Sequence, residues 1–584
     1  MASSSRRFVL LLILSVAACA HDDPRRFPLA PPVMRDQDLD PVATGCRRDA
    51  NAKDGRQLVC APEDYESSFS WDAVDNTIFR PLSKFFQADA ASEAKNVNAF
   101  DEVPDSSWFV NRIGAHPMSP EEAARGYCPE GPELAANPSD GSWLIDRGKD
   151  NGANPGFRVA VGGTKFMFKT DDDQIERATA ATAIASRLYY AAGWWAPCDA
   201  VVYFKRSALR LTPQLTVKAN VGPARPFDEA ALERVLARTG RRGDLDRATA
   251  SRWLPGRPLG PFTYEGKRAD DPSDVIDHED RRDLRGARVI AAWLNHFDSR
   301  EQNTMSTWMP VDPKNPRSTG HVRHWYIDLG DCFGSEWTVD GFSRRHGYSY
   351  VLDFGAIAED FATLGLVERP WDRATRTPGA EIFGYFTAAH FDPDRWRGEY
   401  PNPAFMRMTE HDAAWAARII ARFTPEHVSA AVHVGDFTNP EHERFLVRVL
   451  LERQRLLLLR YFSKLSPLTD LSADGTRLCA VDLARQTEVF SANAFRYSAS
   501  VRRGRGSRSD ARIDVEGNGR VCVALGARDL RSLPDDAPDR YVVISIANGT
   551  GSGPLVVHAY DLGPMRGIRL VGMDRHFPDL AGAP

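Results

Sequence analysis

Three polar residues have the types and the order that phosphoryl-transfer chemistry requires. Asp298 lies five residues before Asn303, and Asp328 ends a short apolar run and is followed by Leu329-Gly330. When a phosphoryl group leaves a nucleotide, one carboxylate orients the acceptor hydroxyl, and an amide and a second carboxylate hold magnesium against the phosphates. We therefore expect Asp298 to act on the acceptor, and Asn303 and Asp328 to be magnesium ligands.

Each of these residues also has an ordinary structural interpretation. Asp298 could cap a helix or lie on the surface, and Asp328 could be a turn residue before Gly330. Asn303 could be a loop amide that bonds its own backbone. The functional interpretation depends on the three residues occurring together.

Lysines on a predicted strand could contact the phosphates. Lys169 ends the run 165–169, and Lys165 lies on the same face because side chains four residues apart on a strand do so. Lys169 is closer to the following helix and is preferred, although a solvated lysine at a strand end is the alternative. Glu176 could pair with Lys169, but an acid in the first helical turn is also favoured by the helix dipole.

Glycines precede this strand. Gly152 and Gly156 lie in the turn-rich segment 148–156 and could cover the phosphates of a nucleotide. Glycine is also what any tight turn requires, so these two residues alone are weak evidence.

Hydrophobic periodicity predicts the elements that would position these residues. Strands are expected at 143–145, 157–161, 165–169 and 201–204, with a helix over 175–192. A densely apolar, buried helix over 283–297 would deliver Asp298, and residues 321–327 form the strand before Asp328. Later helices include 410–423 and 440–462.

The order of these elements, with Lys169, Glu176, Asp298, Asn303 and Asp328, resembles the protein-kinase-like superfamily. The closer similarity is to its atypical branches, the HipA-like and phosphatidylinositol-kinase-like proteins. In those proteins a loop of the form Asp-x-x-x-x-Asn is followed by an Asp that closes a hydrophobic strand. The chain is also similar to a group of uncharacterised bacterial lipoproteins with this core.

The resemblance covers roughly residues 140–465 and implies an α+β fold with a two-lobed core. A β-rich small lobe would span 141–206 and a helical large lobe 207–466, with ATP and magnesium between them. Phe297 precedes Asp298 where ordinary kinases have an arginine, and the glycines match no standard phosphate-binding loop.

The resemblance implies a membrane-anchored atypical kinase that transfers phosphate from ATP to a hydroxyl of an unknown protein, lipid or glycan. Two alternatives stay open. One is a catalytically inactive, pseudokinase-like envelope lipoprotein that binds or scaffolds a partner, and the other is a metal-dependent enzyme of different chemistry on the same fold. The sequence does not decide whether the chain is an active enzyme.

A second segment competes with Asp328. Asp353-Phe354-Gly355 matches the magnesium-binding tripeptide of ordinary protein kinases. It lies 50 residues beyond Asn303, farther than that core usually allows, so Asp328 is preferred. Asp331 is an additional candidate ligand.

The N-terminus has the features of a bacterial lipoprotein signal. Arg6 and Arg7 precede an apolar run over 8–16 that is too short to span a bilayer, and Ala17-Ala18 then precede Cys19. A plain secretory signal is the general interpretation, but the cysteine at this position favours lipidation of Cys19.

We therefore expect a signal peptide over 1–18, a tether over 19–45 and an N-terminal extension over 46–140. By resemblance to well-studied lipoproteins, Ala20 favours the outer membrane of the bacterial cell envelope, with the periplasmic or surface face left open. Contact with the membrane would be through the lipid anchor.

From residue 467 to 584, short β-rich runs broken by Gly, Asn and Asp indicate a separate small all-β domain, most simply a sandwich. An exported chain can oxidise its cysteines. Position favours the disulfides Cys46–Cys60 and Cys479–Cys522, although sequence does not fix connectivity. Cys198 and Cys332 are equally well interpreted as buried thiols.

Composition excludes one class of partner. The formal net charge of −5 over 584 residues gives no electrostatic basis for binding nucleic acid, and we expect a monomer. The charged run 278–283 is most simply a solvated helix start, although Arg281 or Arg282 could brace the catalytic loop.

Overall fold

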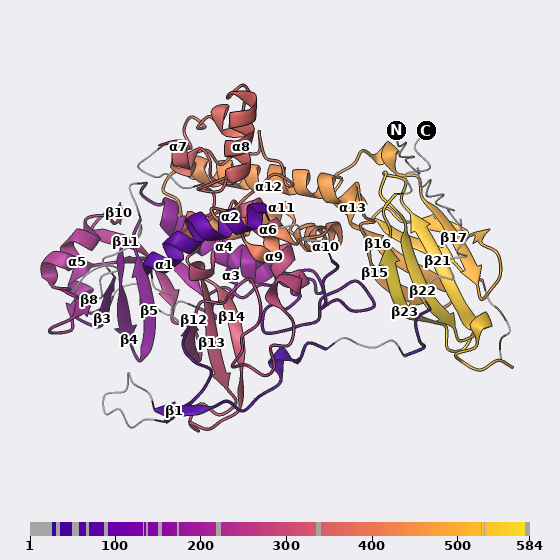
Figure 1. Ribbon diagram of the computed structural model, residues 1–584, viewed down its shortest axis with the longest axis horizontal. Helices are drawn as coiled ribbons and strands as arrows, with labels where there is room; N and C mark the ends of the chain where they lie inside the picture. The colour runs from indigo at the N-terminus through magenta and orange to yellow at the C-terminus, as the bar shows by residue number, and fades with distance from the viewer. Residues whose placement is uncertain are drawn as a thin grey trace, which may run out of the picture.

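The computed structural model describes residues 26–30, 35–48, 58–65, 69–86, 92–131, 134–135, 138–149, 155–171, 174–217, 224–334, 340–526, 528, 530 and 532–578. The predicted signal peptide, Cys19 and Gly152 lie outside these residues. The described chain is a mixed α+β structure with a β-rich part on the left of Figure 1, a helical centre and a β domain on the right. Within it, no helix combines the length and the apolar character that crossing a membrane requires.

The β-rich part is built on a sheet with the strand order β10-β11-β5-β4-β3-β7, and β6 also pairs with β11. Its strands are β3 (Trp143–Lys149), β4 (Gly156–Val161), β5 (Thr164–Lys169), β6 (Asp199–Phe204), β7 (Leu209–Leu211), β10 (Arg241–Arg242) and β11 (Leu245–Arg252). Phe157 and Val159 on β4, and Phe166 and Phe168 on β5, are buried and alternate with more exposed residues. This alternation places one face of the sheet against a core that α5 (Glu229–Leu236) completes.

Helix α4 (Arg177–Ala192) follows β5 and is buried along almost its whole length. Its alanines, with Ile184 and Leu188, make it apolar on most faces, and such a helix is stable only when it is enclosed. The helix ends at Gly193, whose φ of 128° is a conformation that L side chains rarely adopt. A Cβ at this position would lie 2.1 Å from the ring of Phe109, so glycine is required there.

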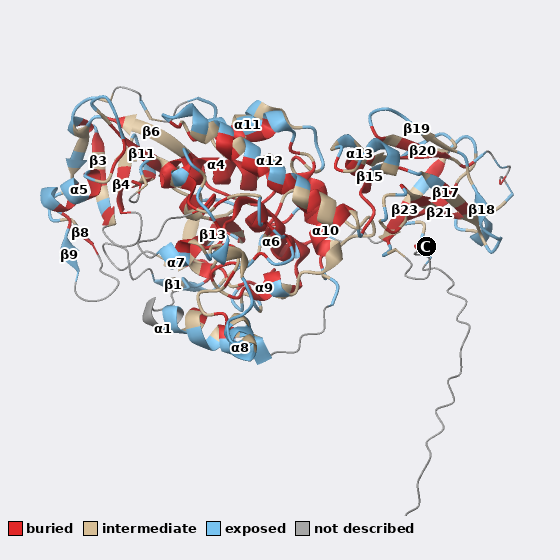
Figure 2. Ribbon diagram, turned by 90° about the horizontal axis from the view of Figure 1, so that it is seen from above, coloured by how far each residue is buried: buried red, intermediate tan, exposed pale blue. Residues whose placement is uncertain are grey.

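The helical centre is organised around α6 (Arg282–Leu294). It packs against α10 (Glu410–Ile420) and the long α12 (Pro440–Phe462), with Trp293 and Trp415 fully buried. In Figure 2 these helices are largely red, that is, buried. A short sheet of β12 (Arg257–Gly260), β13 (Thr304–Pro310) and β14 (Gly320–Tyr326) lies beside them.

Shorter elements complete the described chain. They are β1 (Cys46–Arg48), β2 (Leu58–Cys60), α1 (Phe69–Val74), η2 (Asp75–Phe79), α2 (Arg80–Phe86), α3 (Pro120–Arg125), β8 (Thr216–Val217), β9 (Arg225–Pro226), α7 (Asp340–Ser343), α8 (Phe354–Thr363), α9 (Pro403–Met406), α11 (Pro425–His433) and α13 (Leu483–Gln486).

Much of the predicted tether is instead part of the folded body. Phe27 is buried, and its backbone N–H donates to the Tyr541 hydroxyl at 2.9 Å. Asp36 and Asp38 are also buried. The prediction of a tether over 19–45 is therefore wrong for 26–30 and 35–45. A composition rich in Pro, Asp and Arg suggested solvation, but here the charges find partners.

Those partners come from the charged run 278–283, which is buried rather than solvated. Its arginines bind carboxylates from distant segments: Arg281 binds Asp36 and Asp38, and Arg282 binds Asp101 and Asp412. Both arginines therefore fasten α6 to the N-terminal segments and to α10 rather than bracing the segment 298–303. A buried charge requires such a partner, because leaving it unpaired is costly.

The C-terminal domain contains two antiparallel sheets that pack face to face. One has the order β15-β16-β20-β19 and the other β18-β17-β21-β22-β23. The strands are β15 (Leu468–Asp474), β16 (Arg477–Asp482), β17 (Ser498–Arg503), β18 (Ser509–Asp510), β19 (Ile513–Val515), β20 (Arg520–Ala524), β21 (Tyr541–Ala547), β22 (Leu555–Asp561) and β23 (Ile568–Arg575). Leu478 and Val523 from the first sheet share a core with Ile544 and Val557 from the second.

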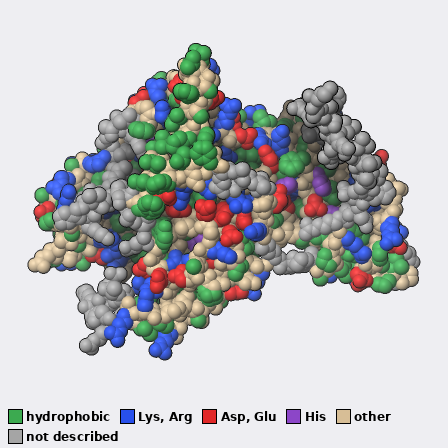
Figure 3. Space-filling model, viewed as in Figure 1, with side chains coloured by type: hydrophobic (Ala, Val, Ile, Leu, Met, Phe, Trp, Pro, Cys, Tyr) green, Lys and Arg blue, Asp and Glu red, His purple; other side chains and the backbone are tan. Residues whose placement is uncertain are grey.

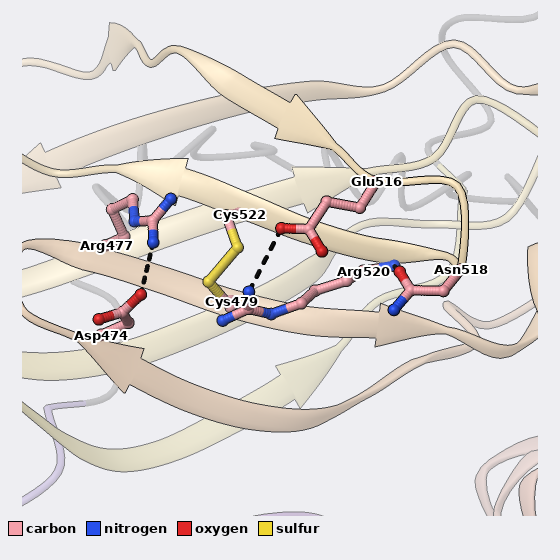
Figure 4. The surroundings of a disulfide bond; sticks show 7 residues. All are labelled: Asp474, Arg477, Cys479, Glu516, Asn518, Arg520 and Cys522. Carbon is pink, nitrogen blue, oxygen red and sulfur yellow. Dashed lines mark hydrogen bonds and ion pairs between the residues drawn. A yellow bond between two sulfur atoms is a disulfide. The ribbon is translucent and has the colours of Figure 1, made fainter.

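Disulfides join both pairs expected from position. Cys479 and Cys522 face each other directly on β16 and β20 (Figure 4), and Cys46 and Cys60 do the same on β1 and β2. A third disulfide, Cys128–Cys198, was not anticipated. Cys332 is buried, and it is the free thiol among the described cysteines.

Arg281→Ala should lower the free energy of unfolding by about 3–5 kcal/mol, because it leaves several buried carboxylates without their cation. Lys95→Ala is the control. Lys95 Nζ lies 2.6 Å from Asp280, but its side chain is 57% exposed, so its removal should cost less than about 1 kcal/mol. Urea unfolding followed by circular dichroism measures both variants, and equal losses would contradict the argument.

Candidate active site

Lys169 and Asp328 meet between the β-rich part and the helical centre. Lys169 is the last residue of β5, and Asp328 follows β14 after one residue. The Lys169 Nζ lies 2.6 Å from Asp328 Oδ1, although the two residues are 159 positions apart in sequence. The competing Lys165 is more exposed and lies 3.5 Å from Asp146. Two of the residues expected to converge therefore form a direct ion pair.

The β13–β14 hairpin brings Asn303 close to Asp328. β13 begins directly after Asn303, and its first residue, Thr304, pairs with Tyr326 at the end of β14. The Ile327 N–H donates to the Asn303 carbonyl at 3.0 Å. The backbone of one expected magnesium ligand is therefore bonded to the residue that precedes the other.

The backbone at Asp328 is unusual. Its φ of 57° and ψ of 51° place it in the left-handed region, which is uncommon for a residue other than glycine. Such conformations persist only where the surroundings enforce them, and they cluster at functional sites. The ion pair with Lys169 and the hairpin on the other side provide that constraint.

The segment from Asp298 to Asn303 is closed by a hydrogen bond between its first and last residues. The Asn303 Nδ2 donates to the Asp298 carbonyl at 2.7 Å, a bond that fits the ordinary interpretation of a loop amide. It also leaves the amide oxygen on the opposite side of the group. Asp298 is delivered by α6, which ends at Leu294 rather than at 297 because Asn295 adopts a left-handed φ of 52°.

Asp298 lies in a buried group of charged side chains. Arg300 Nε is 3.0 Å from Asp298 Oδ1. Burial raises the pKa of Asp298 well above its usual range; Arg300 opposes this shift, while the carboxyl groups of Glu399 and Asp331 add to it. A carboxyl with a raised pKa is suited to accept a proton near neutral pH. Glu399 reaches this position because its backbone N–H donates to the Phe297 carbonyl at 2.6 Å.

A second lysine, Lys149, belongs to the site and was missed in the sequence. In the sheet, Lys149 pairs with Gly156, and Gly156 pairs with Lys169. Residues directly opposite each other on neighbouring strands share a face, so the two lysines flank a glycine. Burial lowers the pKa of Lys149 to about 8, with Lys169 acting in the same direction and Asp328 and Asp331 opposing it.

Gly156 has a steric role between the lysines. A Cβ at this position would lie 2.0 Å from the Phe168 carbonyl oxygen, so a side chain cannot be accommodated. Gly152, the other glycine of interest, cannot be placed because it is outside the described residues.

These two lysines favour the ionised form of Asp328. Burial alone would raise the pKa of Asp328, but the ammonium groups of Lys169 and Lys149 outweigh burial and hold this pKa well below its usual range. The pKa of Asp328 is therefore lowered, whereas that of Asp298 is raised. Carboxyl groups with opposite shifts are typical of sites that divide binding and proton transfer between them.

The predicted pairing of Glu176 with Lys169 is wrong. The Glu176 carboxylate accepts from the backbone N–H of Thr438 at 3.0 Å and from its hydroxyl, while Lys169 contacts Asp328. Glu176 precedes α4 with a φ of 74° and is not part of its first turn. The next residue, Arg177, links α4 to the segment after Asp328 through the carbonyls of Gly330 and Gly334.

Asp353, the competing carboxylate, has a structural role. Its side chain accepts from the Ala356 N–H at 3.0 Å and caps the N-terminus of α8. Arg397 Nη1 lies 2.5 Å from the same carboxylate. This arrangement accounts for Asp353 without catalysis and supports the choice of Asp328.

The donor set fits magnesium by chemistry. Asn303, Asp328 and Asp331 offer amide and carboxylate oxygens, the hard ligands that magnesium prefers. Over the described ranges, no three His, Cys, Asp or Glu side chains are already grouped tightly enough to hold a metal ion. Because Lys169 Nζ lies 2.6 Å from Asp328 Oδ1, binding of a metal at Asp328 would require Lys169 to shift.

No protein-family model matches this chain, and searches of curated proteins and of solved structures also find no match.

Lys149→Met should weaken binding of ATP, the ligand that the sequence predicts, by about tenfold, because one of the two ammonium groups that would attract its phosphates is lost. In the wild type, affinity should fall as the pH rises through about 8, where the pKa of Lys149 lies and its charge disappears. Lys149→Arg keeps the charge and should flatten this fall. Calorimetric titration with ATP and magnesium from pH 6.5 to 9 tests the pattern, which an identical fall in Lys149→Arg would contradict.

Proposed function

We propose that this protein is a membrane-anchored atypical kinase that transfers the γ-phosphoryl group of ATP to an acceptor hydroxyl. The observation that carries the proposal is the 2.6 Å contact between Lys169 and Asp328. These residues were expected to meet only if a kinase-like arrangement of segments forms. The same candidate site also contains Asn303, Asp298 and Lys149, which was not anticipated.

The order of elements supports the same proposal. The antiparallel neighbours β3, β4 and β5 are followed by α4, and β11 then lies between β5 and β6. A helix, the Asp298–Asn303 segment, a hairpin and Asp328 follow in that order. A small β-rich lobe above a helical lobe, with the site between them, is the arrangement that the kinase-like resemblance implies.

The residues would divide the work of phosphoryl transfer as follows. Lys169 and Lys149 would bind the phosphates, and Asp298 would accept the proton of the acceptor hydroxyl. The hydroxyl oxygen forms a bond to the γ-phosphorus, the bond from this phosphorus to the β,γ-bridging oxygen breaks, and ADP leaves. Magnesium held by Asn303, Asp328 and Asp331 would neutralise charge on the phosphates.

The pseudokinase-like alternative also has an observation in its favour. The Lys169 ammonium occupies the carboxylate that a magnesium ion would use, so the ion pair is complete without any ligand. A protein that only scaffolds could keep this arrangement permanently. Nucleotide binding is therefore the property that separates the two candidate functions.

ATP with magnesium should raise the melting temperature of the wild type, because selective binding to the folded state stabilises by about 2.7 kcal/mol at one hundred times Kd. Asp328→Ala should abolish this shift. Asp353→Ala is the matched control: it removes the other candidate carboxylate, a helix cap, and should keep the shift. An absent shift in the wild type at millimolar ATP favours the scaffold.

Glu399→Gln should move the pH dependence of ATP turnover to lower pH. Turnover requires ionised Asp298, so it should rise with pH through the pKa of this carboxyl. Glu399 raises that pKa in the wild type, and removing its charge lowers it. Turnover of γ-labelled ATP measured across the acid range tests the shift.

Asp298→Asn should reduce turnover by about 10²–10⁴-fold while keeping ATP binding, and an active Asp298→Asn protein would contradict the assignment.

A further inference from the structure

One helical segment on the surface directs polar side chains toward the protein and apolar side chains toward solvent. α1, η2 and α2 follow one another without a break over 69–86. Apart from the buried Pro81, the side chains that face the protein are polar: Arg80 lies 3.3 Å from Glu301, and Lys84 lies 3.2 Å from Glu265. Asn76 on the same face is buried. Polar residues therefore attach this segment to the protein body.

The apolar side chains of the same segment point outward. Trp71, Ile78, Phe79, Phe85 and Phe86 are 58%, 45%, 51%, 49% and 75% exposed. In a water-soluble helix the apolar stripe normally faces the core and the charged residues face solvent. Here the pattern is reversed, so burial against the described residues does not account for the exposure of these side chains.

Helix α8 continues this apolar surface. No residue of α8 is buried, and Ile357, Phe361 and Leu364, at helical spacing, are 51%, 86% and 87% exposed. Phe85 of α2 and Phe354 of α8 have ring centroids 6.4 Å apart, so the two helices adjoin. We call the surface of 69–86 and 354–367 the apolar platform. Figure 3 shows green side chains gathered over α8 and α2.

Three arginines beside the platform are paired with acids of the same chain. Arg344 binds Asp340 at 2.7 Å, Arg369 binds Asp360 at 2.6 Å, and Arg373 binds Glu368. Complementary charges at the rim of a protein interface steer the partner and fix its register. Arginines that are paired within the chain are less available to steer a protein partner. A fluid lipid surface does not require such steering.

The composition of the platform suits a bilayer. Surfaces that lie in the membrane interface present Trp, Phe and Leu from amphipathic helices, and patches larger than a few hundred Å² are rarely left exposed on soluble monomers. Cys19 precedes Arg26 by seven residues, and Arg26 binds Tyr560 of the β domain, so a lipid on Cys19 would keep the bilayer within about 25 Å of that part of the same molecule. At such proximity, even weak docking is favoured by effective concentration.

We propose that the apolar platform docks on the surface of a lipid bilayer and inserts the side chains of α1–α2 and α8 among the acyl chains near the headgroups. The proposal uses the lipidation of Cys19 but does not depend on phosphoryl transfer. It applies equally to a kinase and to a scaffold. Because the three arginines beside the platform are paired, docking depends on apolar insertion and should respond little to salt or to anionic lipid.

A dye on the platform tests the proposal. Phe361→Cys in the full-length lipidated protein is labelled with an environment-sensitive fluorophore and reconstituted into phosphatidylcholine vesicles. We expect its emission to shift to shorter wavelength and to be quenched by lipids brominated on their acyl chains. The control label is at Val311→Cys, which is 65% exposed just after β13, outside both the platform and the β domain that Arg26 contacts, and it should show neither change.

A second variant separates the platform from the anchor. Ile357→Glu with Leu364→Glu should abolish the spectral shift while the melting temperature stays unchanged, because both side chains already face solvent. If the dye at position 361 reports an aqueous environment on vesicles when Ile357 and Leu364 are unchanged, the proposal is overturned. A shift that depends on protein density and resists brominated lipid also overturns it and indicates contact between two copies.

Discussion

The ion pair between Lys169 and Asp328 fixes the relation between the β-rich part and the helical centre. Opposite charges that are largely withdrawn from water are stable only when each compensates the other. One charge comes from the end of β5 and the other from the end of a hairpin in the helical part, so their contact sets the separation of these two parts. Arg177, at the start of α4, reinforces it by binding two carbonyls just beyond Asp328. The same ion pair helps to hold the pKa of Asp328 below its usual range.

Sequence periodicity was sufficient for the elements whose burial is one-sided or complete. α12 has the expected bounds, and the strands β3, β4 and β5 differ from expectation mainly at their ends. The end of α6 was placed three residues too late, because the apolar pattern continues through Phe297 while Asn295 turns the backbone. Such a cap is a local choice of φ and ψ, and hydrophobic spacing does not encode it.

The residues of the candidate site could be predicted where they lie on one continuous stretch of the chain. Asp298, Asn303 and Asp328 belong to a single segment closed by a hairpin, so their spacing carries the information. Lys149 depends on strand register across Gly156, and Glu399 arrives from a segment about a hundred positions away. Glu176 was assigned from the helix that follows it, but its partner Thr438 is remote in sequence. The packed N-terminal segment escaped prediction for the same reason: Asp36 and Asp38 find Arg281 only in three dimensions.

The disulfide between Cys128 and Cys198 has a consequence for how the chain is made. It joins residues 70 positions apart, and the segment between them contains β3, β4, β5 and α4. Because Lys149 and Lys169 lie inside that loop, the pairing of these two thiols constrains the segment that carries both lysines. Chains in which Cys128 and Cys198 are not yet oxidised lack this crosslink. Cys332, sealed in the interior, becomes a competitor for mispairing only in such unfinished chains.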